Sequence, residues 1–365
     1  PASQPASQPA SQPASQRSSS IELMRIFIML VIIAHHYVVN SGLMEIIQQN
    51  SMLPSSLFLL VFGWGGKYGI NCFVMITGYF MCKSSITIKK FIRLLLEIEF
   101  YNLIIYLFFL LTDYVDFSLI EFVKTILPIW GIGVGFVSSY LVFFLFIPFL
   151  NILIRNMTEK QYIRLMILCV IVFMIVPSML IDVKIGYVGW FMVIYFIGGY
   201  IRLFPKKEFK NIKVWGVLTA CLLAISWMSV IVCAWVNSKG ISIFVYHFVN
   251  DCNKVLALVT AITTFLFFKD LHLGHNKIIN NIASTTFGVL LIHANSDTMR
   301  QWLWKDMLNN VGMYRSNLIV VHACLSVLGV YIVCVMIDML RIHLWEKPIM
   351  KWIGRILDNN KTKKY

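Results

Sequence analysis

The stretch ELMRIFIMLVIIAHHY, residues 22–37, decides the fold, because with its flanks it is apolar and long enough to span a bilayer. It carries Arg25 near its start and His35 and His36 near its end. Ionisable side chains are costly inside a membrane, and in such segments they mark functional sites by default. The stretch is therefore both the first predicted transmembrane helix and the first candidate site.

The spacing of the charged groups places them on one stripe of this helix. Arg25 and His36 are eleven residues apart, so at ~100° per residue they differ by only about 20° around the axis. The rise of ~1.5 Å per residue separates them by roughly 16 Å, about half the hydrocarbon thickness. His35 points about 100° away from His36 and is expected to line a neighbouring surface or to pack.

Composition excludes a soluble protein. The 365 residues are 59% hydrophobic and 13% charged, whereas soluble domains have about 25% charged residues. The eight cysteines fall mostly in apolar runs without a CxxC pair, and they are interpreted as small hydrophobes. Basic cytoplasmic loops account for the net charge of +14, so nucleic acid is not an expected partner.

The hydropathy pattern predicts an all-α, polytopic integral membrane protein with about ten transmembrane helices. Most of the 31 basic residues then fall on one side, which predicts that both termini are cytoplasmic. His36 would face the opposite side. The expected spans are 21–40, 68–82, 91–111, 137–154, 162–180, 187–204, 214–236, 254–268, 282–296 and 318–340.

Three parts of the chain are distinguished. Residues 1–16 repeat Pro-Ala-Ser-Gln four times, and residues 1–20 are interpreted as a disordered linker outside the fold. Residues 21–345 form the transmembrane domain, and residues 346–365 form a basic cytoplasmic tail.

A second basic cluster opens the third predicted span, at Lys89, Lys90 and Arg93. Two interpretations stand about even. The cluster satisfies the positive-inside rule, or it captures a phosphate-bearing cytosolic ligand, with arginine making bidentate contacts and lysine acting as a point charge.

Two glutamates follow in the same span. Glu97 lies four residues after Arg93, which predicts an intrahelical ion pair. Glu99 faces another way and needs a partner, for which Arg25 is a candidate, and it is kept as a substrate-site candidate.

Two further features are His293, which lies later in the chain, and the pair Thr77-Gly78. His293 falls near one end of its predicted span, on the same side of the membrane as His36. The two histidines can therefore meet at similar depth. The pair Thr77-Gly78 is interpreted as a helix-packing contact, because small residues permit close approach. No metal-binding HExxH pattern is present, and no metal is expected.

At this point the sequence resembles the membrane acyltransferase-3 family. The first-helix signature Arg-x10-His matches Arg25 and His36, and the basic start of the third span matches the family's Arg-x-x-Arg at Lys90-Phe-Ile-Arg93, with lysine in the first place. Three other stretches are similar in order and spacing, and the likeness covers residues ~21–345 (Gly69–Tyr79, Trp190–Arg202 and Phe287–Asn295).

The resemblance implies transfer of an acyl group, usually acetyl, from cytosolic acetyl-CoA to a hydroxyl of a cell-surface or lipid-linked polysaccharide, as in capsule or exopolysaccharide biosynthesis. His36 would be the catalytic histidine. Arg25, Lys90 and Arg93 would hold the CoA donor, and His35, Glu99 and His293 are substrate-site candidates. The location implied is the bacterial plasma membrane, and a homo-oligomer is compatible with it.

Two other functions remain open. The membrane part of certain vancomycin-resistance serine racemases resembles the same family, so the chain is alternatively a transporter of a small, serine-like solute with His36 as a proton relay. A catalytically silent component of glycan assembly or export is the third reading.

Overall fold

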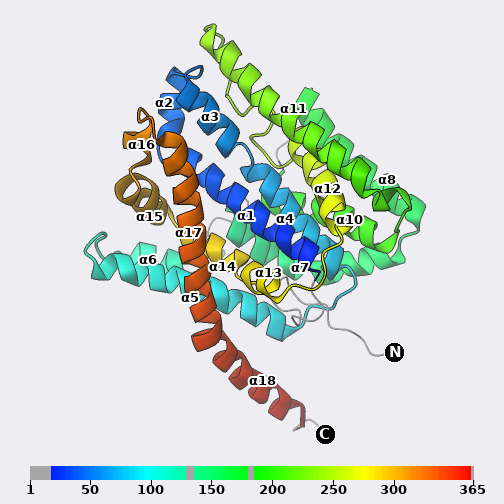
Figure 1. Cartoon of the computed structure of the whole chain (residues 1–365). Helices are drawn as coiled ribbons and strands as arrows, with labels where there is room; N and C mark the ends of the chain where they lie inside the picture. The colour runs from blue at the N-terminus through cyan, green and yellow to red at the C-terminus, as the bar shows by residue number, and fades with distance from the viewer. Residues whose placement is uncertain (1–17, 129–134, 180–184, 363–365) are drawn as a thin grey trace.

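The computed structural model describes residues 18–128, 135–179 and 185–362. Figure 1 shows a bundle of helices with no strand among the described residues. The α-helices are α1 Ser19–Val39, α2 Leu43–Gln49, α3 Pro54–Gly63, α4 Gly66–Met81, α5 Ile88–Leu111, α6 Leu119–Ile126, α7 Phe136–Asn156, α8 Glu159–Val170, α9 Val176–Met179, α10 Tyr187–Leu203, α11 Ile212–Ser238, α12 Val255–Lys269, α13 Lys277–Ala283, α14 Thr286–His293, α15 Asp297–Arg300, α16 Asn310–Met313, α17 Ile319–Arg341 and α18 Lys347–Thr362. Four short 3₁₀ or π segments join them: η2 Ile171–Ile175, η3 Glu208–Lys210, η4 Gln301–Met307 and η5 Ile342–Glu346.

The all-helical, membrane-spanning character predicted from the sequence is confirmed. Six helical runs are long and apolar enough to cross a bilayer by length and composition: 19–39, 54–81, 88–111, 136–156, 212–238 and 319–356. Two shorter apolar helices, α10 and α12, coincide with two further expected spans. The count of about ten spans and the cytoplasmic side of the termini stay predictions, and the Pro-Ala-Ser-Gln repeat lies outside the described residues.

Helix α1 is the central element of the bundle (Figure 1). It packs against α3, α4, α12, α13, α14 and α17. Because it is surrounded by protein, its polar side chains must find partners there, and Glu22 and Arg25 are 2% and 1% exposed. The first predicted span is therefore a core helix rather than a lipid-facing one.

Helices α4 and α10 cross at very short range. A Cβ on Gly78 would lie 2.6 Å from the backbone oxygen of Tyr195, and one on Gly198 would lie 2.4 Å from that of Met75. Contacts this close require glycine, as in other small-residue crossings of membrane helices. The prediction that Thr77-Gly78 serves helix packing is confirmed.

The expected span 282–296 is wrong as a single helix. Helix α13 ends at Ala283, α14 covers only Thr286–His293, and α15 begins at Asp297. Hydroxyl and amide side chains interrupt the run: Thr285 Oγ1 donates to the Ile282 carbonyl at 2.7 Å, and Ser296 caps α15. Broken helices at membrane depth are tolerated where they line a cavity, and this segment does so.

A buried ion network fastens α5 to α17. Arg341 donates to Glu97 at 2.9 Å, to Asp338 at 2.6 Å and to Glu346 at 2.6 Å. Arg93 also forms an ion pair with Glu346. The intrahelical Arg93–Glu97 pair expected from the sequence is therefore wrong, since each residue pairs instead with a partner from the C-terminal part of the chain.

Candidate functional site

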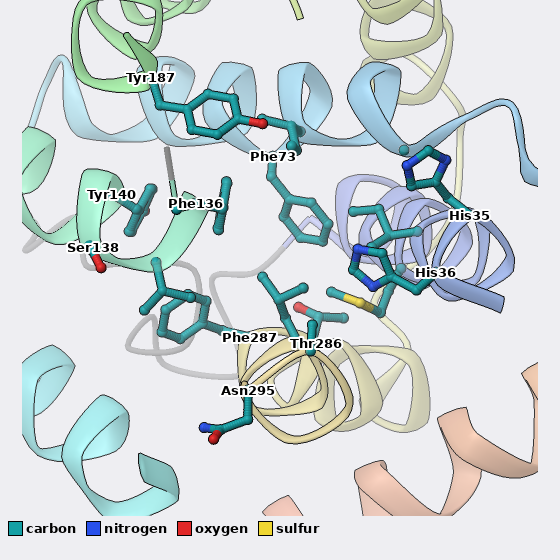
Figure 2. Close-up of a pocket in the computed structure, with 18 of the residues that line it drawn as sticks. His35, His36, Phe73, Phe136, Ser138, Tyr140, Tyr187, Thr286, Phe287 and Asn295 are labelled. Carbon is teal, nitrogen blue, oxygen red and sulfur yellow. The ribbon is translucent and has the colours of Figure 1, made fainter. Parts of the chain in front are cut away.

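A cavity of about 410 Å³ lies between α1, α4, α5, α7, α10 and the broken α13–α15 segment. Helix α1 contributes Met29, Ile32, His35 and His36 to its wall. Met29, Ile32 and His36 continue the stripe that begins at Arg25, because they follow it by four, seven and eleven residues. Figure 2 shows His35 and His36 side by side at one end of this cavity.

The cavity follows α1 from Met29 to His36, about two helical turns, and Arg25 is not among its described lining residues. Helix α4 runs antiparallel to α1, since Gly66 closely approaches His35 and Gly69 approaches Ile32. Both Gly66 and Thr77 line the cavity, and eleven residues of α-helix span roughly 16 Å. The cavity thus extends along α4 from the level of His36 towards the end of α1 that carries Arg25.

The two histidines His36 and His293 touch. His36 Nδ1 lies 3.0 Å from His293 Nε2, and His293 Nδ1 lies 2.6 Å from the carbonyl oxygen of Val289. A carbonyl can only accept, so His293 carries its proton on Nδ1 and its Nε2 accepts from His36 Nδ1. In the neutral state this leaves the lone pair of His36 on Nε2, where it can take a proton or attack a carbonyl carbon.

His35 lies beside this pair and lines the same cavity. Its Nδ1 is 2.6 Å from the carbonyl oxygen of Gly63. A side chain on Gly66 would collide with the His35 ring, with a Cβ 2.2 Å from its Cδ2. His35 is therefore held by α3 and α4. It packs, as one of the two expectations had it, but it lines the same cavity as His36 rather than a neighbouring surface.

Arg25 is buried at the other end of the stripe, one turn before Met29. Its Nη1 donates to both carboxylate oxygens of Glu22, at 2.9 and 3.1 Å. Its partner is thus on its own helix, and the suggested pairing with Glu99 is not among the contacts of the described residues.

Helix α5 presents one face to the cavity. Leu94 and Glu97 line it, and Lys90 occupies the same face one turn earlier, where its Nζ donates to Ser84 Oγ at 3.0 Å and to the Ser85 carbonyl at 2.7 Å. Glu99 lies off this face, so the structure brings Glu97, rather than Glu99, to the cavity.

Two lining cations were not singled out as site residues from the sequence. Lys67 lies in α4 and Arg300 ends α15, and both line the cavity with His36. The pattern of basic residues predicts that both lie on the side opposite the termini. The signal in the sequence was Lys67 itself, a lysine in the same apolar run as Thr77 and ten residues before it.

Comparison with known proteins identifies the chain's family. The family model described as an acyltransferase domain matches residues 18–339. No curated protein and no solved structure gives a significant match. The matched range includes every helix that lines the cavity and most of the helical bundle. The chain belongs to the acyltransferase-3 family and is a multi-pass membrane acyltransferase.

Proposed function

We propose that this protein is an O-acetyltransferase of the bacterial plasma membrane that moves an acetyl group from cytosolic acetyl-CoA to a hydroxyl of a cell-surface or lipid-linked polysaccharide. The single observation that carries the proposal is the cavity whose wall on α1 runs from Met29 to His36, with His36 in contact with His293. A donor thioester and an acceptor hydroxyl that enter from opposite ends would meet at His36.

In the first route, His36 acts as a general base. Its Nε2 takes the proton of the acceptor hydroxyl while that oxygen attacks the thioester carbonyl carbon; the C–S bond breaks, and the CoA thiolate then receives the proton. Such proton transfer typically contributes ~10²–10⁴-fold to the rate. The His36 Nδ1–H bond to His293 keeps the lone pair of Nε2 directed away from His293 and available to the hydroxyl.

In the second route, the same Nε2 attacks the thioester carbonyl carbon, the C–S bond breaks and CoA leaves as the thiolate, so that His36 carries the acetyl group as an acylimidazolium with its Nδ1–H still donated to His293. The acceptor hydroxyl then attacks the acetyl carbon and the C–N bond breaks. The hydroxyl proton goes to Nε2 and from there to the CoA thiolate, which restores the neutral ring. Both routes use one nitrogen of one residue, and the contacts of His36 are compatible with either.

The donor is proposed to enter at the Arg25 end. CoA is strongly anionic, and Lys90, which is half-buried, lies at the start of the α5 face that lines the cavity. Arg93 and Arg25 are less available, because they pair with Glu346 and Glu22. Lys90, one turn before the lining residue Leu94, is proposed to make the first contact with the donor, and Arg25 would act from its buried position one turn before Met29.

The test separates acetyl transfer from transport of a small solute. The purified chain in lipid nanodiscs is expected to bind acetyl-CoA and to hydrolyse it slowly, and His36→Ala is expected to lose hydrolysis while keeping its melting temperature. His247→Ala, an exposed histidine away from the cavity, is the matched control. Absence of acetyl-CoA binding, or equal hydrolysis by His36→Ala, would overturn the proposal and favour the transporter.

A further inference from the structure

Lys67 is an ammonium group in the wall of the cavity without a carboxylate partner. Its Nζ donates to the Tyr187 hydroxyl at 2.5 Å and lies 5.0 Å from the centre of that ring. Among the described residues it forms no ion pair within 4.0 Å; Asp251 acts on it only at longer range. A charge held at membrane depth by a neutral phenol is costly unless a ligand offsets it.

Arg300 supplies a second cation to the same end from a different helix. Its Nη1 pairs with Asp297, whose side chain is 97% exposed, at 2.6 Å, and its Nη2 donates to the Ala294 carbonyl at 3.4 Å. Its buried Nε has no hydrogen-bond partner among the described residues. The pairing with Asp297 is solvent-exposed and therefore weak, so Arg300 keeps much of its charge for the cavity.

The balance of charge at this end is positive. Glu97 is the only carboxylate among the described lining residues; it belongs to the opposite end and is neutralised by Arg341. Lys67 and Arg300 are both close enough to His36 to act on it electrostatically. An anion bound between them would lie next to Nε2 of His36, the nitrogen that is proposed to take the proton of the acceptor hydroxyl.

We propose that Lys67 and Arg300 bind an anionic group, a carboxylate or a phosphate, of the acceptor, so that the polymer acetylated by this protein is acidic. This inference rests on the proposed function, because only a transferase has an acceptor. Arginine and lysine together suit this task, since one offers a planar fork and the other a compact point charge. Binding the anion would place a neighbouring hydroxyl of the same sugar beside His36.

A different role for the same cations makes different predictions. If Lys67 stabilised the oxyanion of the tetrahedral intermediate instead, its loss would slow acetyl-CoA hydrolysis and transfer to every acceptor alike. If Lys67 binds the acceptor's anion, its loss selectively weakens the binding of charged acceptors, and the effect appears in KM more than in kcat.

The experiment uses three probe sugars with the full chain in nanodiscs: glucose, glucuronic acid and glucose 6-phosphate. Binding is measured by the shift in melting temperature without acetyl-CoA, and transfer by mass spectrometry with it. At least one charged sugar is expected to bind about tenfold more tightly than glucose. Tighter binding of glucuronic acid would indicate a carboxylate site, and tighter binding of glucose 6-phosphate would indicate a phosphate site. The ratio of the affinity for the charged sugar to the affinity for glucose should fall towards one in Lys67→Gln and in Arg300→Gln.

Lys239→Gln, an exposed lysine that does not line the cavity, is the control and should keep the preference. Equal binding of the three sugars, or a preference that survives in both variants, would overturn the inference. The binding arm needs no acetyl-CoA. Charged-sugar selectivity without acetyl-CoA hydrolysis would therefore overturn the proposed transfer while leaving the anion site standing.

Discussion

The two ends of the cavity treat buried charge in opposite ways. At the Arg25 end, Glu97 is neutralised by Arg341, which also binds Asp338 and Glu346. At the His36 end, the Lys67 ammonium group donates to the Tyr187 hydroxyl and forms no ion pair within 4.0 Å among the described residues. Buried charges that pair with one another join helices, whereas a charge without a nearby counter-ion can attract a charged ligand. The comparison separates the part of the polar interior that holds the fold from the part that does chemistry.

The largest effect on stability is expected from breaking the paired end. Arg341→Met leaves three carboxylates without their common cation, and removal of one partner from a buried ion pair costs ~3–5 kcal/mol. The melting temperature in detergent should therefore fall sharply. Lys347→Met, an exposed cation just beyond η5, should melt like the unaltered chain. If the two variants melt alike, the network does not hold α5 to α17.

The next effect concerns His293, which the contacts make a positioning residue for His36. His293→Phe removes the acceptor of His36 Nδ1, and acetyl transfer should fall roughly 10–100-fold, part of the ~10²–10⁴ that a general base supplies. His293→Gln restores an acceptor and should recover part of the rate. The pH–rate profile should move in the phenylalanine variant. An unchanged profile with a lower rate would indicate a packing role alone.

A smaller effect is expected at Arg25. Its loss should raise the apparent KM for acetyl-CoA about tenfold, or ~1.4 kcal/mol, with less change for the acceptor. Because Arg25→Met also leaves Glu22 buried and unpaired, the double variant with Glu22→Gln separates donor binding from stability. A KM for acetyl-CoA that stays constant in the double variant would remove Arg25 from donor binding.

The smallest effect is expected at Lys90, which is half-buried at the start of α5 and would attract the donor as a point charge that salt screens. Lys90→Ala should raise the KM for acetyl-CoA by about two- to fivefold at low ionic strength and by less at high salt. Lys239→Ala should leave it unchanged at both. An effect of Lys90 that does not depend on salt would argue against long-range attraction of the donor.

What the sequence predicted follows from local geometry. The shared face of Arg25 and His36 and the close packing at Gly78 follow from helical period and residue size, and the meeting of His293 with His36 was inferred from similar depth in the membrane. The packing at Gly78 and the contact of His293 with His36 agree with the structure. On the predicted stripe, Met29, Ile32 and His36 line the cavity, whereas Arg25 is buried against Glu22 and is not among the described lining residues.

What it missed depends on contacts between distant parts of the chain. The partner of Glu97 is 244 residues away, at Arg341, and no periodicity reveals such a pair, so the nearby Arg93 was the natural but wrong choice. The break between α13 and α15 was missed because each apolar piece resembles part of one span. Lys67 and Arg300 are far apart in the sequence, and only the structure shows that α4 and α15 bring them to the same cavity.

The most direct test of the central claim is the acetyl-ester content of surface glycans, measured by mass spectrometry in cells that produce the unaltered chain, His36→Ala or His247→Ala at matched membrane levels. The account predicts that acetyl esters disappear only with His36→Ala. Acetylation that persists with His36→Ala would contradict it.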